Sequence, residues 1–356
     1  MLCCEKCFDD RYIKEIIKEM GHIGDCDFCG STNVLCVNPT DLADIFRPLV
    51  ELYSPVENIM PLHDLKEGHG NHLVEKLQDD WEIFAFYDMR KQQELLEEMF
   101  SPIDPSDGYP LFLTSLVERE AEYWGTGYEI SDRMRKQWQE FSYELKFNNR
   151  FFPQKKLDLE RLSDLLSFFS TQFSKEALFF RARTPEIGKD LSLLEMGKPP
   201  PEKTKNGRAN PKGISYLYLS SDAQTAISEV RPFVGAEVVV AQFVVKEDIE
   251  LIDLRNPRID SPFKYGENLE YILNHIGFLR ILGEELSKPI NPASEDIDYL
   301  PSQYLCEFIK SNGYDGVCYK SSTGLGFNIA LFDDSKVEPI TITKYFIRSI
   351  DYGIKE

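Results

Sequence analysis

The chain has 356 residues, of which 42% are hydrophobic and 28% are charged, which is enough for two or three domains with buried cores. Its formal net charge of -20 disfavours binding along a nucleic-acid backbone, which requires a surplus of Lys and Arg. No run of about 18 apolar residues is present, and the first residues lack the apolar stretch of a signal peptide. The composition therefore argues against nucleic acid and membrane as partners and predicts a cytoplasmic protein.

Six of the eight cysteines fall in the first 36 residues, where four of them form two C-x2-C pairs. Cys4 and Cys7 make up the first pair, and Cys26 and Cys29 follow after about 18 residues, a spacing typical of zinc sites. Four thiolates suit tetrahedral Zn²⁺ and leave no open position, so the zinc of this predicted knuckle is structural. Cys3 is the expected spare, although it could replace Cys4. The competing interpretation is a group of free thiols.

Helical patterns occupy the next part of the chain. Residues 9–20, between the two cysteine pairs, form an amphipathic pattern, and from 38 to 173 apolar residues recur at spacings of three and four. Prolines separate several of these segments. We therefore expect an N-terminal zinc knuckle followed by a helical bundle. The expected helices of the bundle cover residues 41–53, 69–86, 89–100, 113–122, 130–147 and 157–173.

After residue 174 the pattern changes to strands with a few intervening helices. Because the two kinds of element do not alternate regularly, we expect an α+β domain rather than a doubly wound sheet. The predicted domains are 1–37, 38–173 and 174–356. The expected strands cover residues 177–183, 214–219, 238–245, 250–254, 316–320, 327–332 and 341–347, and the expected helices cover 221–230, 269–286 and 300–311.

Charged residues in two of these elements are candidates for a functional site. Glu229 is expected in the last turn of its helix, where the macrodipole disfavours a negative charge. A local conflict of this kind indicates function. Arg181 and Arg183 fall on one face of their strand because side chains alternate. Two guanidinium groups can therefore face the same site.

Five short motifs occur in order along this half of the chain. They read Phe-Arg-Ala-Arg at 180–183, Gly-Arg-Ala-Asn-Pro-Lys-Gly at 207–213, Tyr-Leu-Tyr-Leu at 216–219, Thr-Ala-Ile-Ser-Glu-Val at 225–230 and Asp-Gly-Val-Cys-Tyr-Lys-Ser-Ser at 315–322, with Asn328 and Phe332 after them. With these motifs the segment from about 177 to 347 resembles the RES domain family. The zinc-knuckle and helical half is similar to the HEPN-like module found ahead of some RES domains.

The resemblance implies an ADP-ribosyltransferase-like fold with a mixed β-sheet that acts on NAD⁺. RES proteins cleave the bond between nicotinamide and ribose, by hydrolysis or by phosphorolysis with inorganic phosphate as co-substrate. They are commonly toxins that deplete cellular NAD⁺ and are neutralised by an antitoxin. We therefore expect an NAD⁺ glycohydrolase or phosphorylase with an antitoxin or regulatory partner, and we expect a homo-oligomer.

The resemblance also assigns residues to this chemistry. The planar, permanently charged fork of an arginine suits a dinucleotide pyrophosphate. A carboxylate near the ribose can offset the positive charge that develops as nicotinamide leaves. The implied catalytic residues are Arg181, Tyr218, Glu229 and Ser321, and the implied substrate-binding residues are Arg183, Arg208, Tyr216 and Asn328.

Alternatives stay open for two residues and for the activity. Arg183 competes with Arg181, which we prefer because it directly follows an aromatic residue. Ser322 competes with Ser321, and adjacent side chains on a strand point to opposite faces, so at most one of them faces the site. The alternative activities are transfer of ADP-ribose to a macromolecule and a non-enzymatic zinc-knuckle adaptor that only binds a nucleotide.

Overall fold

The structure is a computed structural model that describes residues 1–61, 70–101, 113, 115–119, 121, 124–186, 188–289 and 294–350. Contacts group the chain into two compact units, Met1–Ile130 with Ile259–His275 and Ser131–Arg258 with Ile276–Glu356. Helices and mixed β-sheet occur together, so the predicted α+β class is confirmed. The division into three domains after residues 37 and 173 stays a prediction.

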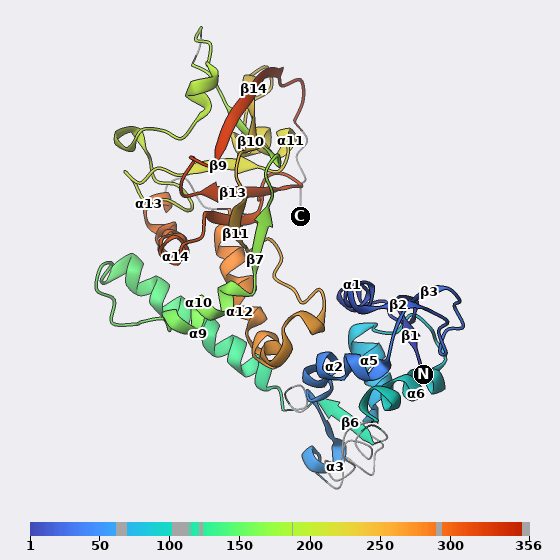
Figure 1. The fold of residues 1–356 in the computed structure, drawn as a ribbon. Coiled ribbons are helices and arrows are strands. Elements are labelled where there is room, and N and C mark those ends of the chain that lie inside the picture. Colours follow the sequence, from blue (N-terminus) through green and yellow to red (C-terminus); the bar gives the residue numbers. More distant parts are fainter. Residues whose placement is uncertain are drawn as a thin grey trace. The chain divides into compact units, whose positions relative to one another are not determined.

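The cysteine-rich segment opens the first unit as a small antiparallel sheet with one helix (Figure 1). Asp10 caps that helix, because its side chain accepts a hydrogen bond from the Ile13 amide. Ile13 and Ile17 are fully buried on one side of the helix, which confirms the amphipathic helix predicted within residues 9–20. The elements are β1 (Cys3–Cys4), η1 (Glu5–Cys7), α1 (Arg11–Met20), β2 (His22–Gly24) and β3 (Val34–Val37), with strand order β1-β3-β2.

The rest of the first unit combines helices with a second small sheet of order β4-β6-β5. The helix predicted for 113–122 is wrong, because β6 lies within this range. Val117 pairs with Pro55 on one side and Asn71 on the other, and partners so distant in the chain leave no local signal. The elements are η2 (Pro39–Leu42), α2 (Ala43–Val50), β4 (Tyr53–Pro55), α3 (Val56–Ile59), β5 (Asn71–His72), α5 (Leu73–Trp81), α6 (Met89–Phe100) and β6 (Leu116–Arg119).

Aromatic side chains form much of the core of the first unit. Phe8, Phe46 and Phe84 are buried together, and the ring centroids of Phe46 and Phe263 are 4.5 Å apart. The segment that carries Phe263 includes η6 (Pro262–Lys264) and η7 (Gly266–Asn268). This packing explains why residues from the second half of the sequence belong to the first unit.

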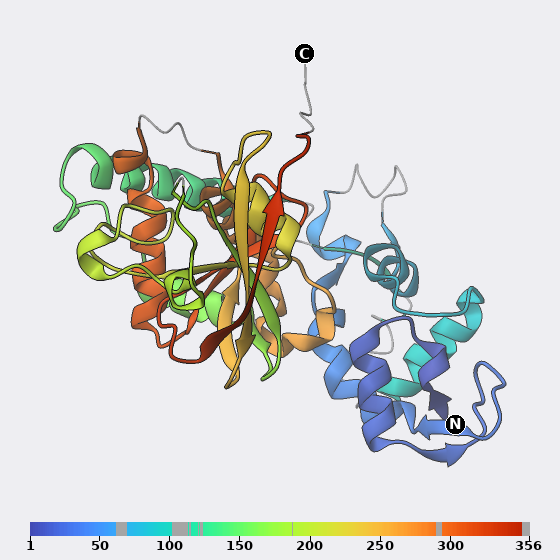
Figure 2. The same cartoon turned by 90° about the horizontal axis from the view of Figure 1, so that it is seen from above.

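An eight-stranded mixed sheet organises the second unit, in the order β14-β10-β8-β9-β13-β12-β11-β7. Only β11 and β12 run parallel among its described neighbours. Figure 1 shows β9, β13 and β11 following one another down the sheet, and Figure 2 shows β14 beside β10 at one edge. The strands are β7 (Ser170–Phe173), β8 (Leu178–Arg183), β9 (Leu217–Ser220), β10 (Glu237–Val245), β11 (Ile249–Asp253), β12 (Gly316–Lys320), β13 (Phe327–Leu331) and β14 (Val337–Phe346).

Helices pack on this sheet, and two of them position the site described below. The short helix α11 packs against β8, β9 and β10, and α14 packs against β12. No helix in the described ranges is both long enough and apolar enough to span a bilayer. Two helices, α9 (Thr126–Phe147) and α12 (Leu269–Ser287), belong to this unit over most of their length. The helices that belong to it entirely are α10 (Leu159–Ser167), η4 (Leu193–Met196), η5 (Pro201–Lys203), α11 (Ala223–Glu229), α13 (Glu295–Asp298) and α14 (Leu300–Ser311).

Most strands predicted for the second half are confirmed within one or two residues, but three boundaries differ. The strand predicted for 341–347 begins four residues earlier, at Val337. The strand predicted from residue 214 begins at Leu217, after a loop. The helix predicted for 157–173 is wrong at its end, because β7 follows α10 there and pairs with β11. Phe173 packs its ring on Phe179 and Phe327, and these contacts between distant segments fix it in the sheet.

Candidate functional site

Glu229 stands at the end of α11, and its carboxylate is held by two donors. The helix begins after Asp222, whose carboxylate accepts a hydrogen bond from the Thr225 amide at 2.7 Å. Ser321 Oγ donates to Glu229 Oε1 at 2.6 Å, and Asn328 Nδ2 donates to the same oxygen at 2.7 Å. These bonds offset the unfavourable position of a negative charge at a helix C-terminus. Among the described residues Oε2 has no hydrogen-bond partner, so it is available to a ligand.

Both donors are themselves fixed by the sheet and its loops. Asn328 lies opposite Ser220 in the β13–β9 pair, and Ser220 Oγ donates to Asn328 Oδ1 at 2.8 Å. Ser321 directly follows β12, and its Oγ accepts hydrogen bonds from the amides of Thr323 at 3.2 Å and Gly324 at 2.8 Å. The Ser321 hydroxyl proton is therefore directed to Glu229. Strand register, rather than local sequence, sets the orientation of the carboxylate.

The glycine-rich loop after β12 lies directly against the start of α11. A Cβ on Gly326 would stand 2.2 Å from Ser221 Oγ, and a Cβ on Gly324 would stand 2.9 Å from Thr225 Cα. The Gly326 amide also donates to Thr225 Oγ1 at 3.1 Å. Only glycine allows this approach. The loop thereby ties the end of β12 to α11, the two elements that carry Ser321 and Glu229.

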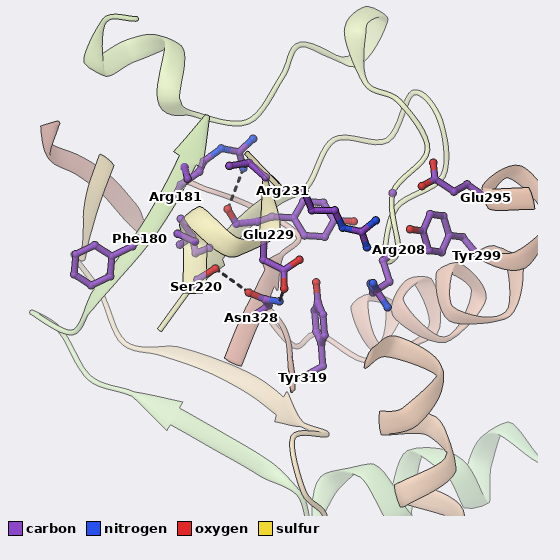
Figure 3. A pocket seen from close by; sticks show the side chains of 16 residues that line it. Phe180, Arg181, Arg208, Ser220, Glu229, Arg231, Glu295, Tyr299, Tyr319 and Asn328 are labelled. Atoms are coloured by element: carbon purple, nitrogen blue, oxygen red, sulfur yellow. Dashed lines mark hydrogen bonds between the residues drawn. The ribbon is translucent and has the colours of Figure 1, made fainter. Parts of the chain in front are cut away.

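Glu229 faces a cavity of about 450 Å³ in the second unit, a volume in the range of small-molecule sites (Figure 3). Five of the predicted residues line it, namely Arg181, Arg208, Tyr218, Glu229 and Asn328, and Ser321 acts on it through Glu229. The other lining residues are Phe180, Ala182, Gly207, Leu219, Ser220, Ala226, Val230, Arg231, Glu295, Tyr299 and Tyr319.

Arg181 brings a desolvated positive charge to this cavity. Its Nη1 donates to the carbonyl oxygen of Tyr218 at 3.0 Å, while its Nε is buried without a hydrogen-bond partner. Burial, reinforced by the neighbouring charge of Arg183, lowers the pKa of Arg181 to about 9, so the group is still charged at neutral pH. No carboxylate of the described residues forms an ion pair with it. A half-buried cation without a counter-ion favours an anionic ligand.

Tyr218 is hydrogen-bonded to the turn formed by residues 207–213, which precedes β9. Its hydroxyl donates to Asn210 Oδ1 at 2.7 Å and accepts from the Ala209 amide at 3.0 Å. Gln303 on α14 donates to the carbonyl oxygens of Gly207 at 2.9 Å and Asn210 at 3.0 Å. A Cβ on Gly207 would stand 2.3 Å from Asn210 Oδ1 and 2.6 Å from the Tyr218 hydroxyl. The turn is therefore a rigid wall of the cavity.

Arg208, in the same turn, has a structural role as well as a place in the cavity. Its Nη1 donates to the carbonyl oxygens of Leu286 at 2.8 Å and Lys288 at 2.5 Å, at the C-terminal end of α12. Its guanidinium carbon stands 5.9 Å from the centre of the Tyr299 ring. These contacts fix the cation at one side of the cavity.

Two of the predicted substrate-binding residues do not line the cavity. Arg183 Nη2 donates to the Gly197 carbonyl oxygen at 2.8 Å. The Tyr216 hydroxyl donates to Glu307 Oε1 at 3.3 Å, and its ring packs on Phe332 with centroids 4.8 Å apart. The strand predicted for 214–219 would place Tyr216 on the same face as Tyr218, but β9 begins at Leu217, after Tyr216.

Eleven lining residues were not among the predicted site residues, and four of them have charged or phenolic side chains. Tyr319 belongs to a motif that pointed to the family, and Arg231 follows Glu229 by two residues, so both had a signal in the sequence. Tyr299 and Glu295 lie at the start of α14 and in α13, and nothing in their local sequence connects them with the site. Only the packing of those helices brings them to the cavity.

The first unit holds a separate cluster of four thiols. The sulfur atoms of Cys4, Cys7, Cys26 and Cys29 all lie within 4.8 Å of one another, with Cys7 and Cys26 3.3 Å apart and Cys4 and Cys29 3.5 Å apart. A tetrahedral zinc ion with Zn–S bonds of about 2.3 Å needs sulfur separations of about 3.8 Å. The four residues therefore fit a metal, and Cys4 rather than Cys3 completes the set.

Comparison with known proteins gave three results. Curated proteins contain no match to this chain. The crystal structure of the M.tuberculosis MbcT-MbcA toxin-antitoxin complex contains a chain that is 13% identical, and the match covers 52% of this chain and 93% of that chain. Its TM-score of 0.32 is too low to establish a common fold. Residues 179–350 match the family model of the RES domain.

The family match covers the strands and the helix that build the cavity. It begins in β8, before Arg181, and ends after β14, so it includes Glu229, Ser321 and Asn328. The HEPN-like identity of the helices in the first half stays a prediction. Residues 179–350 thus match the RES domain family, and the cavity with Glu229 lies within the matched part of the chain.

Proposed function

We propose that the RES domain cleaves NAD⁺ between nicotinamide and ribose. The observation that carries this proposal is the Glu229 carboxylate, which has one oxygen held by Ser321 and Asn328 and the other available in a cavity lined by arginines. A preoriented carboxylate is suited to a transition state that resembles an oxocarbenium ion. The match of residues 179–350 to the RES domain family supports the same substrate.

The reaction breaks the bond between the ribose C1′ and the ring nitrogen of nicotinamide. The electron pair leaves with nicotinamide, which changes from a pyridinium cation to a neutral base, and positive charge appears on the ribose. Glu229 offsets that charge. Water or inorganic phosphate then adds to C1′, and a proton is released to solvent when water is the acceptor. Because the leaving group departs uncharged, no residue has to protonate it.

The arginines supply the attraction for the substrate. A chain with a net charge of -20 repels an anionic dinucleotide at long range, so local cations must overcome this field. Arg181 is desolvated and unpaired, and Arg208 is fixed in place, so both can bind phosphate oxygens without losing much conformational freedom. Tyr218 serves to hold the turn that carries Arg208.

Product analysis by NMR tests the proposed activity. The full-length protein is incubated with NAD⁺ in phosphate buffer and in phosphate-free buffer. Nicotinamide with ADP-ribose identifies hydrolysis, and nicotinamide with ADP-ribose 1″-phosphate identifies phosphorolysis. The absence of nicotinamide in both buffers contradicts the proposal. With NAD⁺ labelled in the adenylate half, label on a macromolecule instead identifies a transferase.

We infer that the chain is a toxin that depletes cytoplasmic NAD⁺ and is controlled by an antitoxin or regulatory protein, and that it forms a homo-oligomer. The match to the RES domain family supports the toxin and its control by an antitoxin. Expression of the wild type is expected to lower cellular NAD⁺ and stop growth, whereas Glu229→Gln is expected to do neither. Growth arrest by Glu229→Gln equal to that of the wild type would favour the non-enzymatic adaptor.

We infer that the four-cysteine cluster holds structural Zn²⁺. Cys4, Cys7 and Cys26 are buried, and the Cys29 amide donates to Cys26 Sγ at 3.5 Å, as amides around metal-bound thiolates do. Gly30 has a φ of 74°, the left-handed conformation that turns the chain after the second cysteine pair. Four thiolates leave no coordination position for a substrate.

A further inference from the structure

Arg231 lines the cavity, although it lies outside the set of residues that the sequence predicted for the site. We propose that Arg231 binds the pyrophosphate of the dinucleotide and sets substrate affinity rather than the rate of bond cleavage. This inference rests on the proposed function, because it names the phosphate contact of the same cavity.

The backbone of Arg231 indicates that its side chain is used. Its φ is 46°, in the left-handed region that glycine adopts readily and residues with a Cβ disfavour. Pro232 disfavours the right-handed helical conformation at the residue before it, and the Arg231 amide donates to the Ser228 carbonyl oxygen at 3.1 Å. Glycine would satisfy this turn at lower cost. A strained residue that carries a long cationic side chain into a cavity points to a functional contact.

The guanidinium of Arg231 has all its donors available. Among the described residues its side chain makes neither a hydrogen bond nor an ion pair, whereas Arg181 donates to Tyr218 and Arg208 donates to two carbonyl groups of α12. Five N–H donors in a planar fork match the oxygens of a phosphate. Arg231 is exposed at the cavity, so a ligand that enters can reach it.

The position of Arg231 relative to Glu229 and Arg208 fits one half of a dinucleotide. Figure 3 shows its side chain running past Glu229 toward Tyr299 and Arg208. Burial raises the pKa of Tyr299, and the charges of Arg208 and Arg231 oppose that shift, as expected if both cations lie near its hydroxyl. In NAD⁺ the ribose that loses nicotinamide is joined directly to the pyrophosphate. Glu229 and Arg231 are two residues apart in the chain. The carboxylate of Glu229 and the guanidinium of Arg231 can therefore contact the ribose and the phosphate, which are neighbouring groups of the substrate.

The test compares Arg231→Gly with a matched control, Glu176→Gly. Glu176 is also a residue other than glycine with positive φ, at 76°, is exposed, and lies outside the cavity. Both changes relieve a left-handed backbone. Arg231→Gly is expected to raise the KM for NAD⁺ about 10- to 100-fold and to leave kcat within about twofold, because a charge-assisted hydrogen bond is lost from ground and transition states alike. Glu176→Gly is expected to change neither constant, and neither variant should melt at a lower temperature.

Calorimetric titration with ADP measures the phosphate contact without turnover. The Kd for ADP is expected to rise in Arg231→Gly by the same factor as KM, to rise less in Arg231→Lys, and to depend less steeply on salt than in the wild type. An unchanged Kd in Arg231→Gly, a fall in kcat without a rise in KM, or no ADP binding by the wild type would overturn the inference. ADP binding that weakens in Arg231→Gly, with no nicotinamide released by the wild type, would instead leave this contact standing and reject the proposed activity.

Discussion

The four-cysteine cluster and the Glu229 cluster are both small sets of converging polar side chains, but they are assembled in different ways. The cysteines come from two short pairs within 26 consecutive residues, and the turns of the knuckle suffice to bring the sulfur atoms together. Glu229, Ser321 and Asn328 come from a helix, a loop and a strand, and they meet because β9, β13 and β12 are neighbours in the sheet. Motif spacing thus specifies the first cluster, while the second depends on the whole sheet.

This difference predicts how each cluster fails. Loss of one ligand should destabilise the knuckle, since the metal would join its two cysteine pairs, whereas loss of one side chain around Glu229 should change catalysis and leave the sheet intact. The changes below test this contrast, from the largest expected effect to the smallest.

Cys26→Ser is expected to have the largest effect. It removes one buried sulfur of the inferred zinc site, so bound zinc should be lost, together with a metal-binding free energy on the order of 10 kcal/mol. Zinc content by mass spectrometry and thermal unfolding with and without chelator measure this loss. Cys36→Ala is the matched control, because Cys36 is buried beside Cys4 on the neighbouring strand but lies outside the four-sulfur cluster, and it should keep one zinc per chain. Full zinc content in Cys26→Ser would contradict the assignment.

Glu229→Gln is expected to lower kcat for NAD⁺ cleavage about 10³-fold, equivalent to about 4 kcal/mol, because the negative charge that stabilises the transition state is lost. The amide keeps an oxygen that can accept from Ser321 and Asn328, so the melting temperature should stay close to that of the wild type. Initial rates of nicotinamide release and the Kd for ADP-ribose are measured together. Retention of more than about a tenth of the wild-type rate would contradict a catalytic role for Glu229.

Ser321→Ala is expected to lower kcat about 10- to 100-fold, because it removes a hydrogen bond to a charged group, worth about 1.5–3 kcal/mol. Ser322→Ala is the control and should leave the rate unchanged. The double variant Ser321→Ala with Asn328→Ala should lose less than the sum of the two single losses, since both donors hold the same oxygen of Glu229. Strict additivity would show that the two residues act independently.

Gly207→Ala is expected to have the smallest effect, a loss of about 1–3 kcal/mol in the free energy of unfolding. The added Cβ would enter the space of the Tyr218 hydroxyl and of Asn210 Oδ1 and break the bond between them. At Gly197 an added Cβ would meet its nearest atom at 3.6 Å, so Gly197→Ala should change stability by less than about 0.5 kcal/mol. Urea unfolding measures both. Equal stability of the two variants would contradict a tightly packed turn.

The outcome of the sequence predictions follows the same contrast. Helices and strands with a clear apolar period, such as α1, β10, β12 and α14, occur where the sequence predicts them. The helices predicted for 113–122 and for the end of 157–173 are wrong, because β6 and β7 are strands only by virtue of partners elsewhere in the chain. Apolar spacing in these short segments satisfies a helix equally well.

Five of the eight predicted site residues line the cavity, and Ser321 contacts Glu229. The other two, Arg183 and Tyr216, form hydrogen bonds with Gly197 and Glu307 instead. The sequence favours Arg181 over Arg183 only because an aromatic residue precedes Arg181. Both arginines lie on β8, but only Arg181 lines the cavity. Tyr299 and Glu295 needed the tertiary structure, since nothing in their local sequence connects them with the site.

By itself the sequence determined the cysteine pairs, the ordered motifs of the RES domain and the residue types that could serve the chemistry, because these are properties of spacing and composition. The tertiary structure decided which oxygen of Glu229 is held, which arginine is desolvated and which helices close the cavity. The physical reason is that hydrogen-bond direction and burial depend on strand register and helix packing, which join residues far apart in the chain.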